Sequence, residues 1–140
     1  WNVVAADYIV RNRMNALRAA RTLALMNMAM MDACIVCWEC KYYYYVPRPA
    51  QMDSRIKTAT GIPNFPAYTS GHSSFSGAAA TVLAHFFPSD ADKFHAMALE
   101  ASMSRLYGAI HYRFDCEAGL ASGQKVGAAA VARAKADGAE

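Results

Sequence analysis

A long apolar run that ends at two prolines constrains the fold of this chain more than any other feature. From about Ala16 into the tyrosines after Lys41, the sequence is rich in Ala, Leu and Met, which favour helix. The run is apolar on most faces, as is typical of a helix surrounded by other helices. Pro47 and Pro49 cannot continue it. We therefore predict one long helix within an all-α helical bundle.

The same run could be read as a membrane span. Its most apolar part, about residues 22–38, contains Asn27 and Asp32, and both are costly inside a bilayer. We expect a buried helix of a soluble protein and no membrane span. The chain starts at Trp1 and shows no charged segment followed by an apolar one. If the protein is exported, its signal segment is therefore absent from this chain, and the compartment stays unknown.

A break and a loop flank the long helix. We predict a short first helix over about residues 1–11, and Asn15 can cap the long helix that follows. Residues 50–69 contain Gly61 and two prolines and show neither helix nor strand periodicity. This composition indicates a loop that crosses the surface of the domain.

Three further helices are expected after that loop. Their sequences are rich in Ala and begin at small or capping residues. The expected ranges are from about residue 73 to Pro88, about 91–112 and about 116–136. Residues 137–140 are expected to be a frayed tail of a single domain, 1–140.

Composition agrees with one soluble domain. The 140 residues are 55% apolar and 18% charged, which is typical of a chain with one core. The net charge of +3 is small, and no basic block is interleaved with aromatic residues. The sequence therefore gives no indication of a nucleic-acid partner. It does not define the oligomeric state.

Three short blocks carry residues suited to chemistry. Lys41 lies in the last turn of the long helix and Arg48 just beyond it, so the two cations can converge on one point. Ser70, Gly71 and His72 precede a helix start, where free backbone N–H groups and the positive end of the helix dipole favour an anion. The third block contains Arg105, His111 and Asp115.

Together these blocks match a tetrahedral oxyanion. Arginine supplies forked donors, and the helix start adds neutral ones. Two histidines allow one to bond the central atom while the other moves protons. Asp115 follows His111 by four residues, so the two share a helical face if the helix continues through them. Asp115 would then fix the tautomer of His111. The predicted ligand is phosphate-like.

In this order and spacing, residues 41–49, 70–72 and 104–115 resemble three signature blocks shared by type 2 phosphatidic acid phosphatases, bacterial acid phosphatases and vanadium-dependent haloperoxidases. The flanking stretches NMAMMDACIVCWECKY and GIPNFPAYTSGHSSFSGAAATVL are similar to soluble bacterial members of the haloperoxidase branch. The resemblance implies the helical bundle of this superfamily, incomplete at its N-terminus here, with 50–69 as an active-site loop. Thr69 is one departure, because the family usually has proline there.

The resemblance also implies a role for each site residue. His111 would be the vanadate ligand of a peroxidase, or the nucleophile that becomes phosphohistidine in a phosphatase. His72 would be the acid–base group near the apical oxygen. Asp115 would orient His111. The residues expected to hold the equatorial oxygens are Lys41, Arg48, Ser70, Gly71 and Arg105.

Two activities follow from the resemblance, and the sequence leaves both open. One is a haloperoxidase that oxidises halide with hydrogen peroxide at a vanadate bound to His111. The other is an acid phosphatase that hydrolyses phosphate monoesters without a cofactor. Trp38 and Phe65 are similar to aromatic residues on the halide side of fungal chloroperoxidase-like members, so we favour the haloperoxidase. A bundle that lacks helices could instead be an oxyanion-binding or assembly module without activity.

Overall fold

The computed structural model describes residues 1–139, and every regular element among them is helical. This confirms the predicted all-α fold. A short 3₁₀ turn, Pro88–Asp90, precedes the fifth helix. The helices are α1 (Asn2–Arg11), α2 (Ala16–Tyr44), α3 (Pro49–Met52), α4 (Gly71–Phe86), α5 (Ala91–Tyr107) and α6 (Arg113–Ala136).

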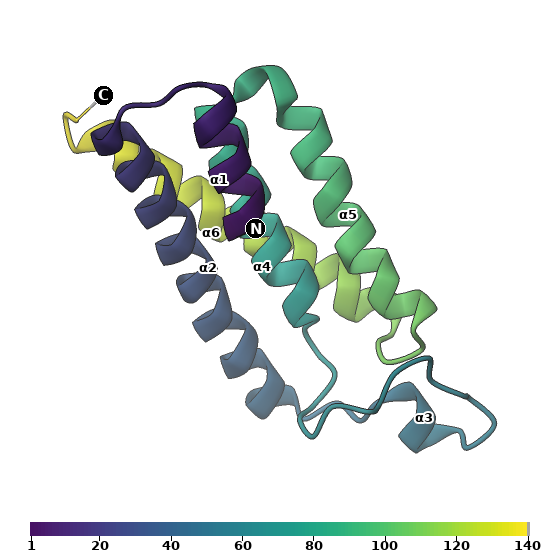
Figure 1. The fold of residues 1–140 in the computed structure, drawn as a ribbon. Helices are drawn as coiled ribbons and strands as arrows, with labels where there is room; N and C mark the ends of the chain where they lie inside the picture. The colour runs from purple at the N-terminus through teal and green to yellow at the C-terminus, as the bar shows by residue number, and fades with distance from the viewer. Residues whose placement is uncertain (140) are drawn as a thin grey trace.

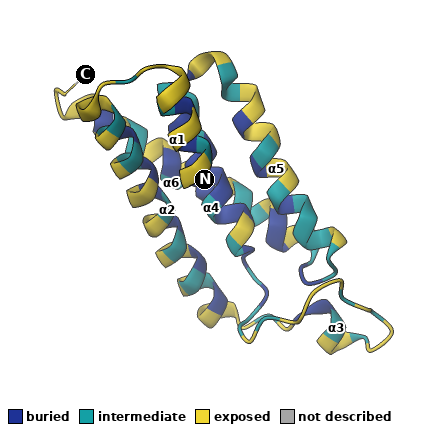
Figure 2. Ribbon diagram, viewed as in Figure 1, coloured by how far each residue is buried: buried dark blue, intermediate teal, exposed yellow. Residues whose placement is uncertain are grey.

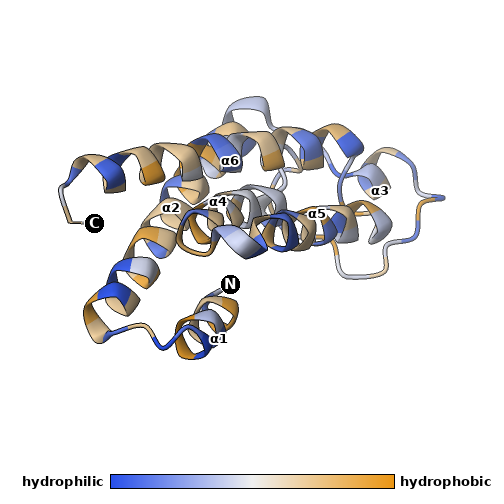
Figure 3. Ribbon diagram, turned by 90° about the horizontal axis from the view of Figure 1, so that it is seen from above, coloured by the Kyte–Doolittle hydropathy of each residue, from blue (hydrophilic) through white to orange (hydrophobic). Residues whose placement is uncertain are grey.

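Helix α4 lies at the centre of the bundle, with α2, α5 and α6 packed around it (Figures 1 and 3). Most of its residues are buried, and many are Ser, Gly or Ala. Such small side chains let the neighbouring helices approach closely. At Gly123 of α6, an added Cβ would overlap the carbonyl oxygen of Ser74 in α4. The two backbones therefore touch directly at this position.

The predicted long helix is confirmed as α2, but its predicted burial is only half correct. The Asn15 side chain caps it by accepting a hydrogen bond from the backbone N–H of Arg18 at 2.9 Å. One stripe, which includes Met26 and Cys37, is buried against α4 and α6. The opposite face is exposed, as Figure 2 shows, and its Ile35 side chain is 57% exposed. The long helix is thus peripheral, and α4 takes the central place.

The exposed face of α2 is largely apolar, although it also carries Asp32 and Glu39. By length and composition, the segment Ala16–Met52 could cross a membrane, although the core helix of a soluble protein meets the same criterion.

Helix α2 ends at Tyr44, and Tyr45 then takes a left-handed backbone conformation with φ of 51°. This residue, rather than Pro47, is the immediate end of the helix.

Other boundaries also differ from the sequence prediction. Helix α4 starts at Gly71 instead of residue 73, because the Ser70 side chain caps it. The predicted helix over 91–112 ends at Tyr107, and α6 starts at Arg113 instead of residue 116. The predicted loop 50–69 begins inside the short helix α3.

The predicted frayed tail is partly ordered. Asp137 forms an ion pair with Arg21 of α2 at 2.9 Å. This contact holds the end of α6 against the start of α2, and these two helix ends lie near each other in Figure 1. Residue 140 of the predicted tail lies outside the described residues.

Candidate active site

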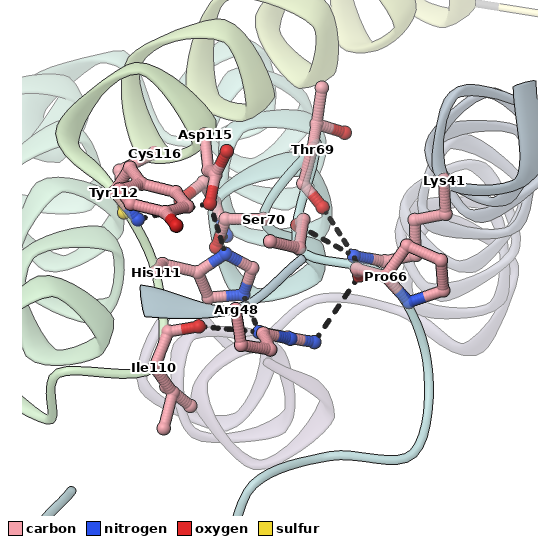
Figure 4. Close-up of polar contacts among 12 residues, drawn as sticks. Lys41, Arg48, Pro66, Thr69, Ser70, Ile110, His111, Tyr112, Asp115 and Cys116 are labelled. Atoms are coloured by element: carbon pink, nitrogen blue, oxygen red, sulfur yellow. Dashed lines mark hydrogen bonds and ion pairs between the residues drawn. The ribbon is translucent and has the colours of Figure 1, made fainter. Parts of the chain in front are cut away.

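The predicted site residues meet at one end of the bundle. The C-terminal end of α2, the N-terminal ends of α4 and α6, and the connecting segment 53–70 come together there (Figures 1 and 4). Residues from all three sequence blocks thus lie at this end of the bundle.

His111 and Asp115 form a buried pair. Their contact joins Nδ1 of His111 to Oδ2 of Asp115 at 2.9 Å, and the backbone N–H of Tyr112 donates to the same oxygen at 3.0 Å. His111 lies in the turn before α6, and Asp115 lies in its first turn. The helix does not continue through both residues, so the condition under which they would share one helical face is not met. They still meet, because a carboxylate at the third helical position reaches back over the helix start.

This pair fixes the chemistry of His111. Asp115 accepts only, so Nδ1 carries the proton and Nε2 carries a lone pair, an assignment that rests on the hydrogen-bond network. Burial lowers the pKa of His111, while the hydrogen bond to Asp115 opposes the change. The imidazole is therefore neutral at neutral pH, and its Nε2 can bond an electrophilic centre.

Arg48 contacts that nitrogen. Its Nη1 lies 2.9 Å from Nε2 of His111 and donates to the carbonyl oxygen of Ile110 at 2.7 Å. Its other nitrogens donate to the carbonyl oxygens of Phe65 and Pro66 at 3.1 to 3.3 Å. The side chain is 1% exposed, and burial lowers its pKa. Arg48 thus ties the His111 turn to the connecting segment.

Lys41 holds the same segment from the other side. Its Nζ donates to the carbonyl oxygens of Pro66, Ala67 and Thr69 at 2.9, 3.0 and 2.6 Å (Figure 4). These contacts use all three N–H bonds of the ammonium group. Burial lowers the pKa of Lys41 to about 8. Direct contact with an oxyanion would therefore require Lys41, like Arg48, to exchange a carbonyl partner.

Arg105 differs from these two cations. Its Nε donates to Oγ of Ser104 at 2.9 Å. Within residues 1–139, its two terminal nitrogens form no hydrogen bond or ion pair with the protein. Arg105 can therefore bind a ligand without breaking a protein contact. His72 lies close enough for the charge of Arg105 to act on it. Partial burial is the larger cause that lowers the pKa of His72, and the charge of Arg105 is the smaller one.

Ser70 and Gly71 have different positions at the start of α4. Ser70 is fully buried, and its backbone N–H donates to the carbonyl oxygen of Asp115 at 3.0 Å. It therefore aligns α4 with α6, and its predicted oxyanion role stays a prediction. Gly71 lines the cavity beside His111. As a first-turn residue, it has a backbone N–H without an intrahelical partner.

The cavity next to His111 has a volume of about 530 Å³. Arg48, Arg105 and His72 line it, together with the predicted wall residues Trp38 and Phe65. The ring centroids of Trp38 and Phe65 lie 5.4 Å apart. The structure therefore brings these two aromatic residues together at the site.

Two aromatic cavity residues were missed in the sequence. Phe75 follows His72 by three residues, so it shares a face of α4 with His72, and this spacing could have identified it. Trp1 also lines the cavity, and its Nε1 donates to Oγ of Ser76 at 2.9 Å. The separation of 75 residues gives no local signal for that contact.

Comparison with known proteins identifies the family of this chain. Residues 19–137 match the family model of the PAP2 superfamily. The chain belongs to the PAP2 superfamily, which confirms the predicted relationship.

Among solved structures, the chain is similar to a bacterial vanadium-dependent iodoperoxidase, with 32% sequence identity and a TM-score of 0.83. The match covers 92% of this chain and 36% of the iodoperoxidase chain, so the chain spans about a third of that protein's length. A comparison with curated proteins gives no match.

The residues present fit a vanadate. The donor set is one neutral histidine nitrogen surrounded by cations, which suits an oxyanion better than a bare metal cation. His111 would supply the nitrogen bond, and Arg48 and Arg105 would balance the negative oxygens. Phosphate has the same requirements, so this donor set does not distinguish the two anions.

Proposed function

We propose that this protein is a vanadate-dependent haloperoxidase-like enzyme that oxidises halide with hydrogen peroxide, with vanadate held at His111. The buried pair of His111 and Asp115 beside Arg48, in a chain 32% identical to a vanadium-dependent iodoperoxidase, supports this proposal. When bound, vanadate would act as a Lewis acid that activates hydrogen peroxide toward the halide.

The protein side of this chemistry follows from the contacts. Asp115 holds the proton on Nδ1 of His111, so Nε2 carries the lone pair of the ligand atom. Nη1 of Arg48 lies 2.9 Å from this nitrogen, so Arg48 would have to turn toward the anion as Nε2 binds it. Arg48 and Arg105 place positive charge beside the negative oxygens. His72 is neutral at neutral pH because its pKa is lowered, so it can accept a proton from a substrate O–H.

An acid phosphatase is the second candidate. The same lone pair on Nε2 of His111 can attack the phosphorus of a phosphate monoester and form phosphohistidine. Arg105 would hold the phosphoryl oxygens. His72 would protonate the leaving oxygen only in its charged form, and because its pKa is lowered, this form is restricted to acidic pH. The match to the PAP2 model favours this reading alongside the first, and it requires no cofactor.

A module without activity is the third candidate. Such a chain would bind an oxyanion or assemble through its exposed apolar surface. Because the match covers only 36% of the iodoperoxidase chain, the assay also has to test for a chain without activity.

One assay separates the three. The purified protein is given iodide or bromide, hydrogen peroxide and a phenolic dye, with and without orthovanadate, and 4-nitrophenyl phosphate hydrolysis is measured on the same sample. Vanadate-dependent halogenation is the expected result. Hydrolysis that vanadate inhibits, without halogenation, would identify the phosphatase, and binding of orthovanadate without either activity would identify the module.

Two variants control this assay. His111→Ala should remove the activity, because it removes the ligand atom. His95→Ala replaces an exposed histidine of α5 and should leave the activity as in the wild type. Activity that survives in His111→Ala would point to a contaminating enzyme.

A further inference from the structure

The cavity beside His111 is larger than peroxide and a halide need. Its volume of about 530 Å³ falls in the range of pockets that hold organic ligands, roughly 300–1,000 Å³. Four aromatic side chains line it, and we call them the aromatic wall: Trp1, Trp38, Phe65 and Phe75. Oxyanion chemistry at His111 does not by itself explain so much aromatic surface.

The rings of the aromatic wall are arranged around Trp38. Its centroid lies 5.4 Å from that of Phe65 and 6.1 Å from that of Phe75, and the planes of Trp38 and Phe75 differ by 11°. The hydrogen bond from Trp1 to Ser76 fixes the fourth ring. Rings at such distances offer faces and edges to a further aromatic group.

The charges in the cavity restrict what can bind. Arg48, Arg105, His72 and His111 line it, and no Asp or Glu is found among the described residues of its lining. Aromatic surroundings can also bind quaternary ammonium ions. Two guanidinium groups repel such cations, so the ligand must be neutral or anionic where it meets Arg105.

We propose that this cavity binds the aromatic ring of an organic substrate against the aromatic wall, with an oxygen substituent of the ring at Arg105. The proposal rests on the proposed function, because it places the substrate beside His72 and His111. The shared chemistry is an aromatic ring bearing an oxygen. If the protein is a peroxidase, the bound ring belongs to a phenol. If it is a phosphatase, the ring belongs to an aryl phosphate.

The test measures binding of 4-nitrophenol to the wild-type chain and to two variants. Both tryptophans of the chain belong to the aromatic wall, so quenching of tryptophan fluorescence reports on this cavity. Calorimetry provides a second readout. Phe75→Leu keeps an apolar side chain but removes a ring, and we expect affinity to fall about three- to tenfold.

Phe86→Leu is the matched control. Phe86 lies on the same helix and is also partly buried, but it does not line this cavity. We expect wild-type affinity for 4-nitrophenol in this variant. Equal losses in the two variants, or equal competition by cyclohexanol, would overturn the ring site. If Phe75→Leu fails to fold, as judged by circular dichroism, Trp1→Leu, measured by calorimetry, removes another ring of the same wall.

Two measurements distinguish an aryl phosphate from a phenol as the bound substrate. Turnover of bound 4-nitrophenyl phosphate supports an aryl phosphate, whereas binding of 4-nitrophenol without ester hydrolysis supports a phenol. Ring binding sensitive to Phe75, without halide oxidation or hydrolysis, would overturn the proposed function and support the ring site. Activity with ring binding insensitive to Phe75 would overturn the ring site alone.

Discussion

The two site histidines differ in position, and this difference predicts separate effects. His111 is buried with its Nε2 held beside Arg48, whereas His72 is exposed near Arg105. We expect His111→Ala to abolish detectable binding of orthovanadate in calorimetry. His72→Ala should keep most of that binding and lower turnover about 10²- to 10⁴-fold, the usual contribution of a general acid–base group. Equal loss of binding in both variants would contradict the assignment.

Asp115 acts through His111, and its replacement tests that role. In Asp115→Asn, the amide can donate to Nδ1, which favours the wrong tautomer of His111. We expect orthovanadate affinity and turnover to fall about 10- to 100-fold. Asp92→Asn is a control, because Asp92 also lies in the first turn of a helix but far from this pair in sequence. A similar loss in Asp92→Asn would indicate a general effect of helix charge.

Lys41 predicts a pH dependence of anion binding. Burial lowers its pKa to about 8, so Lys41 is charged below that pH and loses its charge above it. Affinity for molybdate, which stays a dianion through this range, should therefore fall as the pH rises from about 7 to about 9. Calorimetry at several pH values measures this. Constant affinity across the range would show that the charge of Lys41 does not contribute.

The sequence indicated which residues gather at this end of the bundle, but not which backbone carbonyl groups they contact. The four-residue spacing indicated that His111 and Asp115 meet, and the structure brings them together. The carbonyl contacts of Lys41 and Arg48 come from residues 65–69 and 110, whose backbone path depends on tertiary packing. A sequence pattern for a loop does not specify which carbonyl groups turn inward.

At the scale of helices, the contact between α4 and α6 predicts an unusual response to alanine. Replacing glycine by alanine inside an exposed helix normally stabilises it by about 1 kcal/mol. At Gly123, the new Cβ would overlap the Ser74 carbonyl and force the helices apart. We expect Gly123→Ala to lower the free energy of unfolding by about 1–3 kcal/mol.

Thermal melting followed by circular dichroism measures this effect. Gly61→Ala serves as the control, because a Cβ added at Gly61 meets nothing within 4 Å. A melting temperature of Gly123→Ala at or above that of the wild type would mean that α6 can shift without cost.

Helix existence could be predicted better than helix ends. The capping residue Asn15 identified the start of α2, because its side chain bonds the local backbone. The end of α5 could not be identified, because its sequence stays compatible with helix up to Tyr112. The turn depends instead on Ala109, which adopts φ of 56°. Non-glycine residues adopt that conformation uncommonly, so the alanine gave no local sign of the turn.

At the scale of the whole molecule, the length of an apolar run did not identify the central helix. The long run in α2 is more extended than that of α4, yet α4 is buried and α2 exposes Met31 and Ile35. Small residues decide this arrangement, because Ser, Gly and Ala allow α6 to approach α4 closely. Close packing of small residues, together with the higher average hydrophobicity of α4, therefore selects the centre of this bundle.

The core predicts how the chain unfolds. Buried apolar residues of α1, α2, α4 and α5 form one cluster that includes Tyr8, Met26, Leu83 and Phe94. Because one cluster joins these helices, we expect them to unfold together in a single transition. Helical circular dichroism and tryptophan fluorescence, which reports on the aromatic wall, should give the same melting temperature. Two separate transitions would show that the site end of the bundle unfolds independently of the core.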